Sequence, residues 1–77
     1  MPHVIVKMYS GRPRQQKAML AEAITKAVTG TLGYGEESVS VAIEDVEPKD
    51  WAEAVYRPDI LDRPDEIYKP PGYDPFK

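Results

Sequence analysis

The residue best suited to chemistry in this sequence is the proline at position 2, directly after Met1. Because an initiator methionine is commonly removed before a small residue, Pro2 is expected to become the first residue and to carry a secondary amine. Terminal amines titrate near ~7.7–8.0, so this nitrogen can act as a general acid or base at working pH. The prediction depends on the loss of Met1, since a retained methionine would leave the Pro2 nitrogen an amide without useful basicity.

Most other catalytic sets are excluded by composition. The chain has no cysteine and one histidine, which removes cysteine nucleophiles and His/Cys metal clusters. The glycines of Gly33-Tyr34-Gly35 lack the spacing of a phosphate loop. We therefore expect no metal site. His3 is a candidate for orienting a ligand, although a lone histidine in a strand is more often structural.

The elements that must position these groups form a β-α-β pattern. Residues 3–9 alternate and are rich in β-branched and aromatic types, which predicts a strand. A helix is expected to begin near Pro13 and to end at Gly33. Residues 38–44 alternate again and predict a second strand. The apolar positions of the helix recur at helical spacing: Leu20, Ala23, Ile24, Ala27, Val28 and Leu32.

Two strands joined by a long helix predict an α+β fold with a right-handed crossover and a parallel strand pair. The helix covers one face of the pair, and the open edges need strands from another chain. With 77 residues, the chain is a single domain near the size at which one core is marginally stable alone. We expect a homo-oligomer that completes a larger sheet, and we prefer a dimer to a hexamer.

The segment 47–77 differs in texture from the core, residues 2–46. A short helix is expected over 47–56, stopped at Pro58, and the prolines limit further helix to the pieces 59–63 and 65–69. This tail is expected to wrap over a neighbouring chain through its apolar side chains. The residues expected to make these contacts are Trp51, Tyr56, Ile60, Leu61, Ile67 and Tyr68.

Several of these features occur together in a known family. The terminal proline, Gly11-Arg12 after the first strand, the amphipathic helix and the Ser38-Val39-x-Val41 strand resemble the 4-oxalocrotonate tautomerase family of the tautomerase superfamily. The resemblance covers residues 2–51 without a gap. The ending 69–73, Lys-Pro-Pro-Gly-Tyr, looks like that of small bacterial tautomerases acting on phenylpyruvate-like compounds.

The resemblance implies a cofactor-independent isomerase that interconverts keto and enol forms of a small 2-keto acid, with Pro2 as the catalytic acid and base. Arg12 is implied as the second catalytic residue: its cation disfavours the charged amine and its guanidinium grips the substrate carboxylate. The competing interpretation of Arg12 is a solvated or helix-capping arginine.

Two further positions follow from the resemblance. The family's second arginine falls at Ser40, which favours a monocarboxylate such as an arylpyruvate, because serine offers at most a hydrogen bond. Trp51 aligns with the aromatic wall of the family's pocket, and interface packing is its competing interpretation. We expect Ser40, Trp51 and His3 to bind substrate.

Two alternatives remain open. One is a hydrolytic dehalogenase or a decarboxylase on the same scaffold, which Glu44, Asp45 or Glu47 near a pocket would favour. The other is a non-catalytic oligomer that binds a small ligand, which a retained Met1, or a pocket left too weakly charged by Ser40, would favour.

The distribution of charge along the chain limits the kinds of partner that it can bind. Five cations against one acid give residues 1–35 a charge of +4, and five against twelve give residues 36–77 a charge of −7. Scattered cations on a net acidic protein argue against nucleic acid and suit a small anionic ligand. No apolar run approaches the ~20 residues of a membrane span, and the start lacks a signal pattern, so we expect a cytoplasmic protein without membrane contact.

Overall fold

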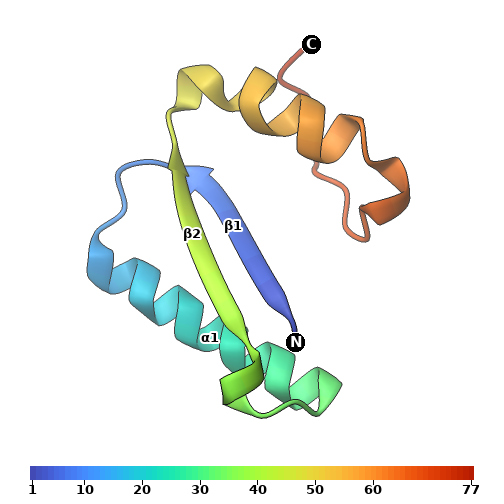
Figure 1. Cartoon of the computed structure of the whole chain (residues 1–77). Coiled ribbons are helices and arrows are strands. Elements are labelled where there is room, and N and C mark those ends of the chain that lie inside the picture. The colour runs from blue at the N-terminus through green and yellow to red at the C-terminus, as the bar shows by residue number, and fades with distance from the viewer. The chain divides into compact units, whose positions relative to one another are not determined.

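The computed structural model describes residues 1–77, which divide into two compact units, Met1–Asp45 and Val46–Lys77. The elements of the β-α-β part are β1 (His3–Tyr9), α1 (Arg14–Leu32), the 3-10 turn η1 (Glu36–Ser38) and β2 (Ser40–Val46). The rest of the chain holds η2 (Pro48–Asp50), η3 (Ala52–Leu61) and η4 (Pro64–Glu66). The predicted order of strand, helix and strand is confirmed (Figure 1).

The strands β1 and β2 lie side by side and run parallel as a two-stranded sheet (Figure 1). The backbone N–H of Ser40 donates to the carbonyl of Pro2 at 3.1 Å, and in a parallel ladder this bond sets Ser40 beside His3. The predicted span of β1 is confirmed. The predicted start of β2 at residue 38 was wrong by two residues, because the N–H of Ser38 turns back to the carbonyl of Gly35 at 3.1 Å.

The helix α1 is closed at its end by glycine, as predicted. Gly33 has φ 79°, the left-handed conformation, and its N–H donates to the carbonyl of Thr29 at 3.0 Å. At the other end the helix begins at Arg14, one residue later than expected. Pro13 precedes it in extended conformation, with φ −69° and ψ 154°, and its carbonyl accepts the N–H groups of Gln16 and Lys17 at 3.1 and 3.2 Å.

One face of α1 covers the sheet, but this face is narrower than the predicted apolar stripe. Ile24 and Val28 are half-buried, as expected, whereas Ala23 and Ala27 are exposed and Leu32 is 60% exposed. The prediction of a single buried stripe was therefore wrong in part. Two strands are too narrow to cover the whole stripe, and its outer side stays open in a single chain.

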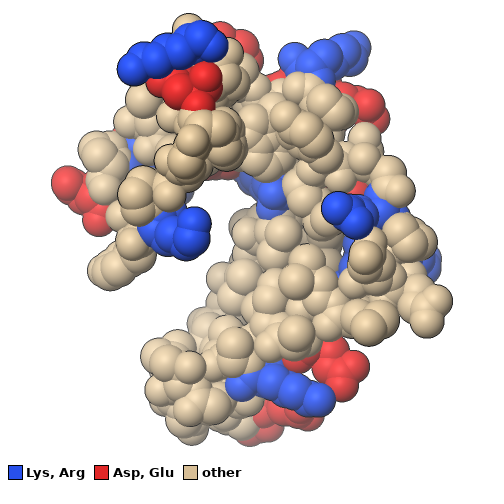
Figure 2. Space-filling view, turned by 180° about the vertical axis from the view of Figure 1, so that it is seen from behind, with Lys and Arg blue, Asp and Glu red and all other residues tan.

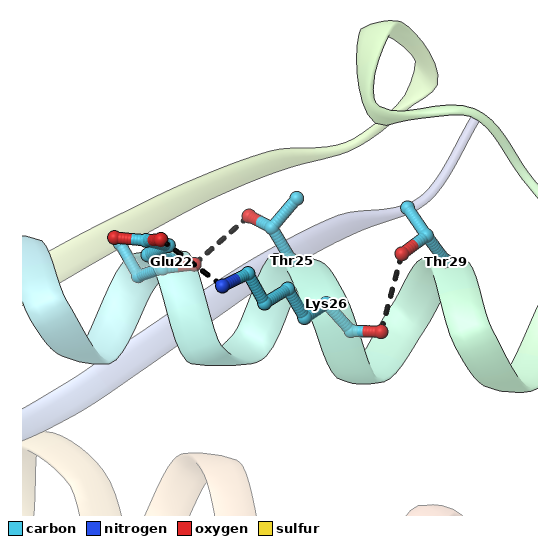
Figure 3. Close-up of polar contacts among 5 residues, drawn as sticks. Glu22, Thr25, Lys26 and Thr29 are labelled. Carbon is cyan, nitrogen blue, oxygen red and sulfur yellow. Dashed lines mark hydrogen bonds and ion pairs between the residues drawn. The ribbon is translucent and has the colours of Figure 1, made fainter.

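Hydrogen bonds and an ion pair connect side chains to neighbouring groups along α1 (Figure 3). The hydroxyl of Thr25 donates to the carbonyl of Ala21 at 2.8 Å, and that of Thr29 donates to the carbonyl of Lys26 at 3.1 Å. These back-bonds satisfy two half-buried hydroxyls inside the helix. Lys26 pairs with Glu22 at 3.2 Å, and since both side chains are 69% exposed the pair contributes about 0.3–0.5 kcal/mol.

The helix of the second unit does not stop at Pro58, contrary to the prediction. It continues to Leu61 as η3, a π-helix, and the N–H of Asp62 donates to the carbonyl of Arg57 five residues back, at 3.0 Å. The wider π turn accommodates a proline ring that in an α-helix would clash with the carbonyl four residues earlier. The predicted piece 59–63 thus belongs mostly to η3. The piece expected at 65–69 is only the turn η4.

The second unit has its own small aromatic core. Val55 and Tyr56 are 5% and 8% exposed, and the Tyr56 ring lies 5.6 Å from that of Tyr73 and 5.8 Å from that of Phe76. Tyr56 is therefore packed within its own unit, and its contact with a neighbouring chain stays a prediction. Tyr68, by contrast, is 97% exposed.

Large apolar side chains remain exposed in both units. Ile5 and Tyr9 of β1 are each 52% exposed, and Met19 of α1 is 62% exposed. Figure 2 shows, on one face, Lys, Arg, Asp and Glu in small separate groups between wider uncharged areas. Exposed apolar surface of this extent is typical of a chain that associates. None of the helices combines the length and apolar character required for a membrane span.

Candidate active site

Three of the predicted site residues lie where the two strands begin: Pro2 directly before β1, His3 at its start and Ser40 at the start of β2. Pro2 is half-buried, and its carbonyl is tied to the N–H of Ser40, so the backbone around its nitrogen is fixed by the sheet. Met1 is 90% exposed, and its removal would disturb little packing. The structure therefore brings Pro2, His3 and Ser40 together at one end of the strand pair.

His3 and Ser40 are joined directly. The Nδ1 atom of His3 lies 2.6 Å from the Oγ atom of Ser40, and both residues are exposed. Strand alternation puts both side chains on the sheet face opposite α1. The sequence predicted each of these residues as a substrate contact, but the bond between them was missed, because it depends on the register of the two strands.

Arg12 lies at the other end of β1. Seven strand residues separate it from Pro2, a span of roughly 23 Å at ~3.3 Å per residue, so one chain does not bring the two groups together. The guanidinium is exposed and its Nη1 donates to the Oε1 of Gln16 at 3.4 Å, a long bond to a neutral partner. The contacts within its own unit therefore fix the Arg12 guanidinium only weakly.

An open hollow of about 320 Å³ adjoins Arg12. Its size is at the lower end of the range for small-molecule sites. Lys17 also lines it, and the Nζ of Lys17 pairs with the carboxylate of Asp45 at 2.5 Å. The hollow is lined by Met8, Arg12, Gln16, Lys17 and Leu20. The prediction from sequence missed Gln16 and Lys17, which lie in the first turn of α1, four and five residues after Arg12.

Trp51 belongs to the second unit, and its indole has a defined partner. The Nε1–H donates to the hydroxyl oxygen of Tyr73 at 2.9 Å, and the side chain is half-buried. The ring of the same tyrosine packs at a tilt of 52° against Tyr56, whose pKa is raised, chiefly by burial and further by the charge of Asp74. Trp51, Tyr56 and Tyr73 therefore form an aromatic cluster within the second unit. The structure shows no group of three His, Cys, Asp or Glu side chains that could hold a metal ion.

The comparison with known proteins decides the family. A family model described as tautomerase enzyme matches residues 2–57, from the candidate catalytic proline into η3. The chain belongs to the tautomerase family. A probable tautomerase of Xylella fastidiosa is 42% identical over 73 residues, covering 95% of this chain and 89% of the relative. The tautomerase PptA of Cronobacter sakazakii is 35% identical over 78 residues, covering 96% and 99%.

A solved structure supports the same placement. YwhB, described as a homologue of 4-oxalocrotonate tautomerase, is 43% identical, with a TM-score of 0.64 over 69% of this chain and 87% of its own. The predicted family and the β-α-β fold of the α+β class are thereby confirmed. The protein is an isomerase of the tautomerase type, as predicted.

Proposed function

We propose that this tautomerase interconverts the keto and enol forms of a 2-keto acid with one carboxylate and an apolar tail, such as phenylpyruvate. The amine of Pro2, freed by removal of Met1, takes a proton from the carbon beside the carbonyl and returns it in the reverse direction. The observation that carries the proposal is the placement of Pro2 at a fixed sheet end directly beside Ser40, with an exposed Arg12 free to serve a second chain.

Arg12 of a partner chain anchors the carboxylate in this proposal. Arg12 cannot reach the Pro2 of its own chain, because the seven residues of β1 lie between them. Two chains related by a two-fold axis can set the start of one β1 near the end of the other. Each site then takes Pro2 from one chain and Arg12 from the next, and a dimer contains two such sites. The guanidinium binds a carboxylate bidentately and opposes protonation of the nearby amine.

The choice of a monocarboxylate rests on Ser40. An arginine at this position would add a second permanent cation, whereas serine adds only a neutral hydroxyl. A substrate with a second carboxylate would find no matching charge from Ser40 or from His3 when its imidazole is neutral. The aromatic side chain of Trp51 is proposed to contact the apolar tail of the substrate.

The oligomer is proposed to be a dimer, one of the small assemblies expected for this family. The exposed side chains of Ile5, Tyr9 and Met19 supply apolar surface for association. Size-exclusion chromatography with light scattering is expected to give the mass of two chains. A mass of six chains would overturn the dimer and leave the chemistry untouched. The cytoplasmic location stays a prediction.

The dehalogenase alternative needs a free carboxylate to activate water. Asp45, one of the candidates for that role, is instead paired with Lys17. A non-catalytic binding oligomer is favoured if Met1 is retained or if Ser40 leaves the pocket too weakly charged. No observation raises either alternative to a second proposal.

The test is the ultraviolet assay of phenylpyruvate enol disappearance, with protein whose N-terminus has been verified by intact mass. Arg12→Ala is expected to reduce kcat/KM by roughly 10–100-fold, because a charged hydrogen-bond partner is worth about 1.5–3 kcal/mol. Pro2→Ala, which leaves a more mobile primary amine, is expected to lower kcat/KM by at least about tenfold.

Arg14→Ala is the matched control, since Arg14 is also exposed and lies two residues further on. Wild-type rates in both the Pro2 and Arg12 variants would end the proposal.

A further inference from the structure

We propose that His3 and Ser40 form a proton relay to the carbonyl oxygen of the substrate. The inference rests on the proposed function and gives this pair a catalytic task beyond contact with the ligand. Pro2 moves the proton at carbon, and the Ser40 hydroxyl moves the proton at oxygen, with His3 as its acid and base.

The geometry of the pair carries the inference. The Nδ1 of His3 lies 2.6 Å from the Oγ of Ser40, a distance at the short end for a hydrogen bond between these groups. The N–H of Ser40 is bonded to the carbonyl of Pro2, so the Ser40 hydroxyl projects from the strand position next to the catalytic amine. His3 follows Pro2 directly in the chain. The pair that would exchange a proton with the substrate oxygen therefore lies next to Pro2, which exchanges a proton with the neighbouring carbon. A keto-enol reaction requires both transfers within one site.

A serine hydroxyl alone is a weak acid, and this is why His3 matters. An arginine at position 40 would stabilise charge on the substrate oxygen without exchanging a proton, because its guanidinium stays protonated. A serine bonded to an imidazole can do both: it donates a hydrogen bond and passes a proton on. Histidine is the side chain whose ordinary pKa, near ~6.5, allows this exchange close to neutrality.

The proton steps balance in both directions. In enol formation, Pro2 accepts the proton from the carbon beside the carbonyl as the C=O bond becomes C–O. The oxygen takes the Ser40 proton, and Ser40 takes one from Nδ1 of the His3 imidazolium. In ketonisation, the enol proton passes to Ser40 while the Ser40 proton passes to neutral His3, and protonated Pro2 delivers its proton to carbon. Water restores the starting protonation states of Pro2 and His3 between turnovers.

The surroundings leave this exchange accessible. The pair is exposed on the sheet face opposite α1, and the structure places no other element of its unit on that face. Strand alternation brings two further charged residues to the same face, Lys7 on β1 and Glu44 on β2, each four residues beyond its member of the pair. The amine of Pro2 directly precedes His3 in the chain.

Four variants test the relay through kcat, KM and the pH profile of phenylpyruvate enol ketonisation. Ser40→Ala and His3→Ala are each expected to lower kcat by roughly 10–100-fold, with a KM change of less than about threefold. The double variant is expected to be no slower than either single one, since the two groups act as one unit. Ser40→Thr keeps the hydroxyl and is expected to keep most of the activity.

His3→Asn separates a relay from a structural hydrogen bond. Its amide can still bond Ser40 from the position of Nδ1, but it cannot exchange a proton in this pH range. We expect kcat to fall as in His3→Ala, and the pH dependence that a histidine acid and base would give to wild-type kcat to be absent from this variant. Intact mass and circular dichroism verify the terminus and the fold of each variant.

The outcomes separate the relay from the proposed function. Wild-type kcat and an unchanged pH profile in His3→Asn would overturn the relay while wild-type ketonisation still upheld the function. Additive losses in the double variant would also overturn it. Absence of ketonisation in wild-type protein with a free Pro2 amine would instead overturn the proposed function itself.

Discussion

Mixing two inactive variants tests whether each active site draws on two chains. Pro2 directly precedes the seven residues of β1, and Arg12 follows them after Ser10 and Gly11, so the strand alone puts roughly 23 Å between the two within a chain, several times the length of an arginine side chain. Pro2→Ala chains and Arg12→Ala chains each lack one half of every site when alone. In a mixed oligomer, one kind of site combines both defects and the other combines the intact Pro2 with the intact Arg12.

The expected recovery follows from counting. In an equal mixture that associates at random, half of the chains supply an intact Pro2 and half supply an intact Arg12, so roughly a quarter of all shared sites are intact. This fraction is the same for a dimer and a hexamer. The two variants are unfolded in urea, mixed, refolded and assayed for phenylpyruvate enol ketonisation. The expected rate is about 25% of that of wild-type protein treated in the same way.

The control replaces Arg12→Ala with the double variant of Pro2 and Arg12, which leaves no intact site in any mixture. Native mass spectrometry verifies that mixed oligomers have formed. Mixed oligomers with no gain over the separate variants would refute the reasoning from strand length, and would mean that Arg12 reaches Pro2 of its own chain or has no role.

Three predictions concern the scaffold. Gly33→Ala forces a Cβ into a left-handed position, with φ 79°, and is expected to lower the free energy of urea unfolding by about 1 kcal/mol; an unchanged midpoint would contradict this. Tyr73→Phe removes the acceptor of the Trp51 indole N–H and is expected to shift the tryptophan emission and to cost about 1 kcal/mol, whereas an unmoved spectrum would show the bond to be absent in solution. Arg57 holds the pKa of Glu53 below its ordinary 4.5 through a hydrogen bond, so this stabilisation is present above that value and is lost as pH falls through the lowered pKa. Glu53→Gln should therefore lower Tm at pH 7 and match wild type in strong acid, and an equal difference at both pH values would rule the pair out as the cause.

The sequence was most informative where local chemistry dictates structure. Alternation predicted β1 correctly, and the glycine at the end of α1 was recognised because only a left-handed position needs it there. Pro58 misled the prediction, since its effect was judged for an α-helix and the chain adopts a π-helix instead. The width of the buried stripe on α1 was overestimated, because the sequence of the helix does not tell how many strands it covers.

The residues of the candidate site stay a prediction, and their arrangement was not predictable from the sequence. Pro2 and Arg12 stood out from position and family resemblance, yet strand length separates them in one chain, and only an oligomer can reunite them. The bond between His3 and Ser40 depends on the register of β1 against β2, which the N–H of Ser40 sets on the Pro2 carbonyl. A pattern read along one strand does not contain that register.

The central claim, that the amine of Pro2 does the chemistry, is tested most directly by blocking that one nitrogen. Wild-type protein with Met1 removed, and the same protein with one extra residue kept before Pro2, are compared in the phenylpyruvate enol assay after intact-mass verification of both. Since Met1 is 90% exposed, the added residue should leave fold and oligomer mass unchanged. We predict ketonisation by the first protein and a loss of at least about a hundredfold in the second. Equal rates from the two proteins would contradict the claim.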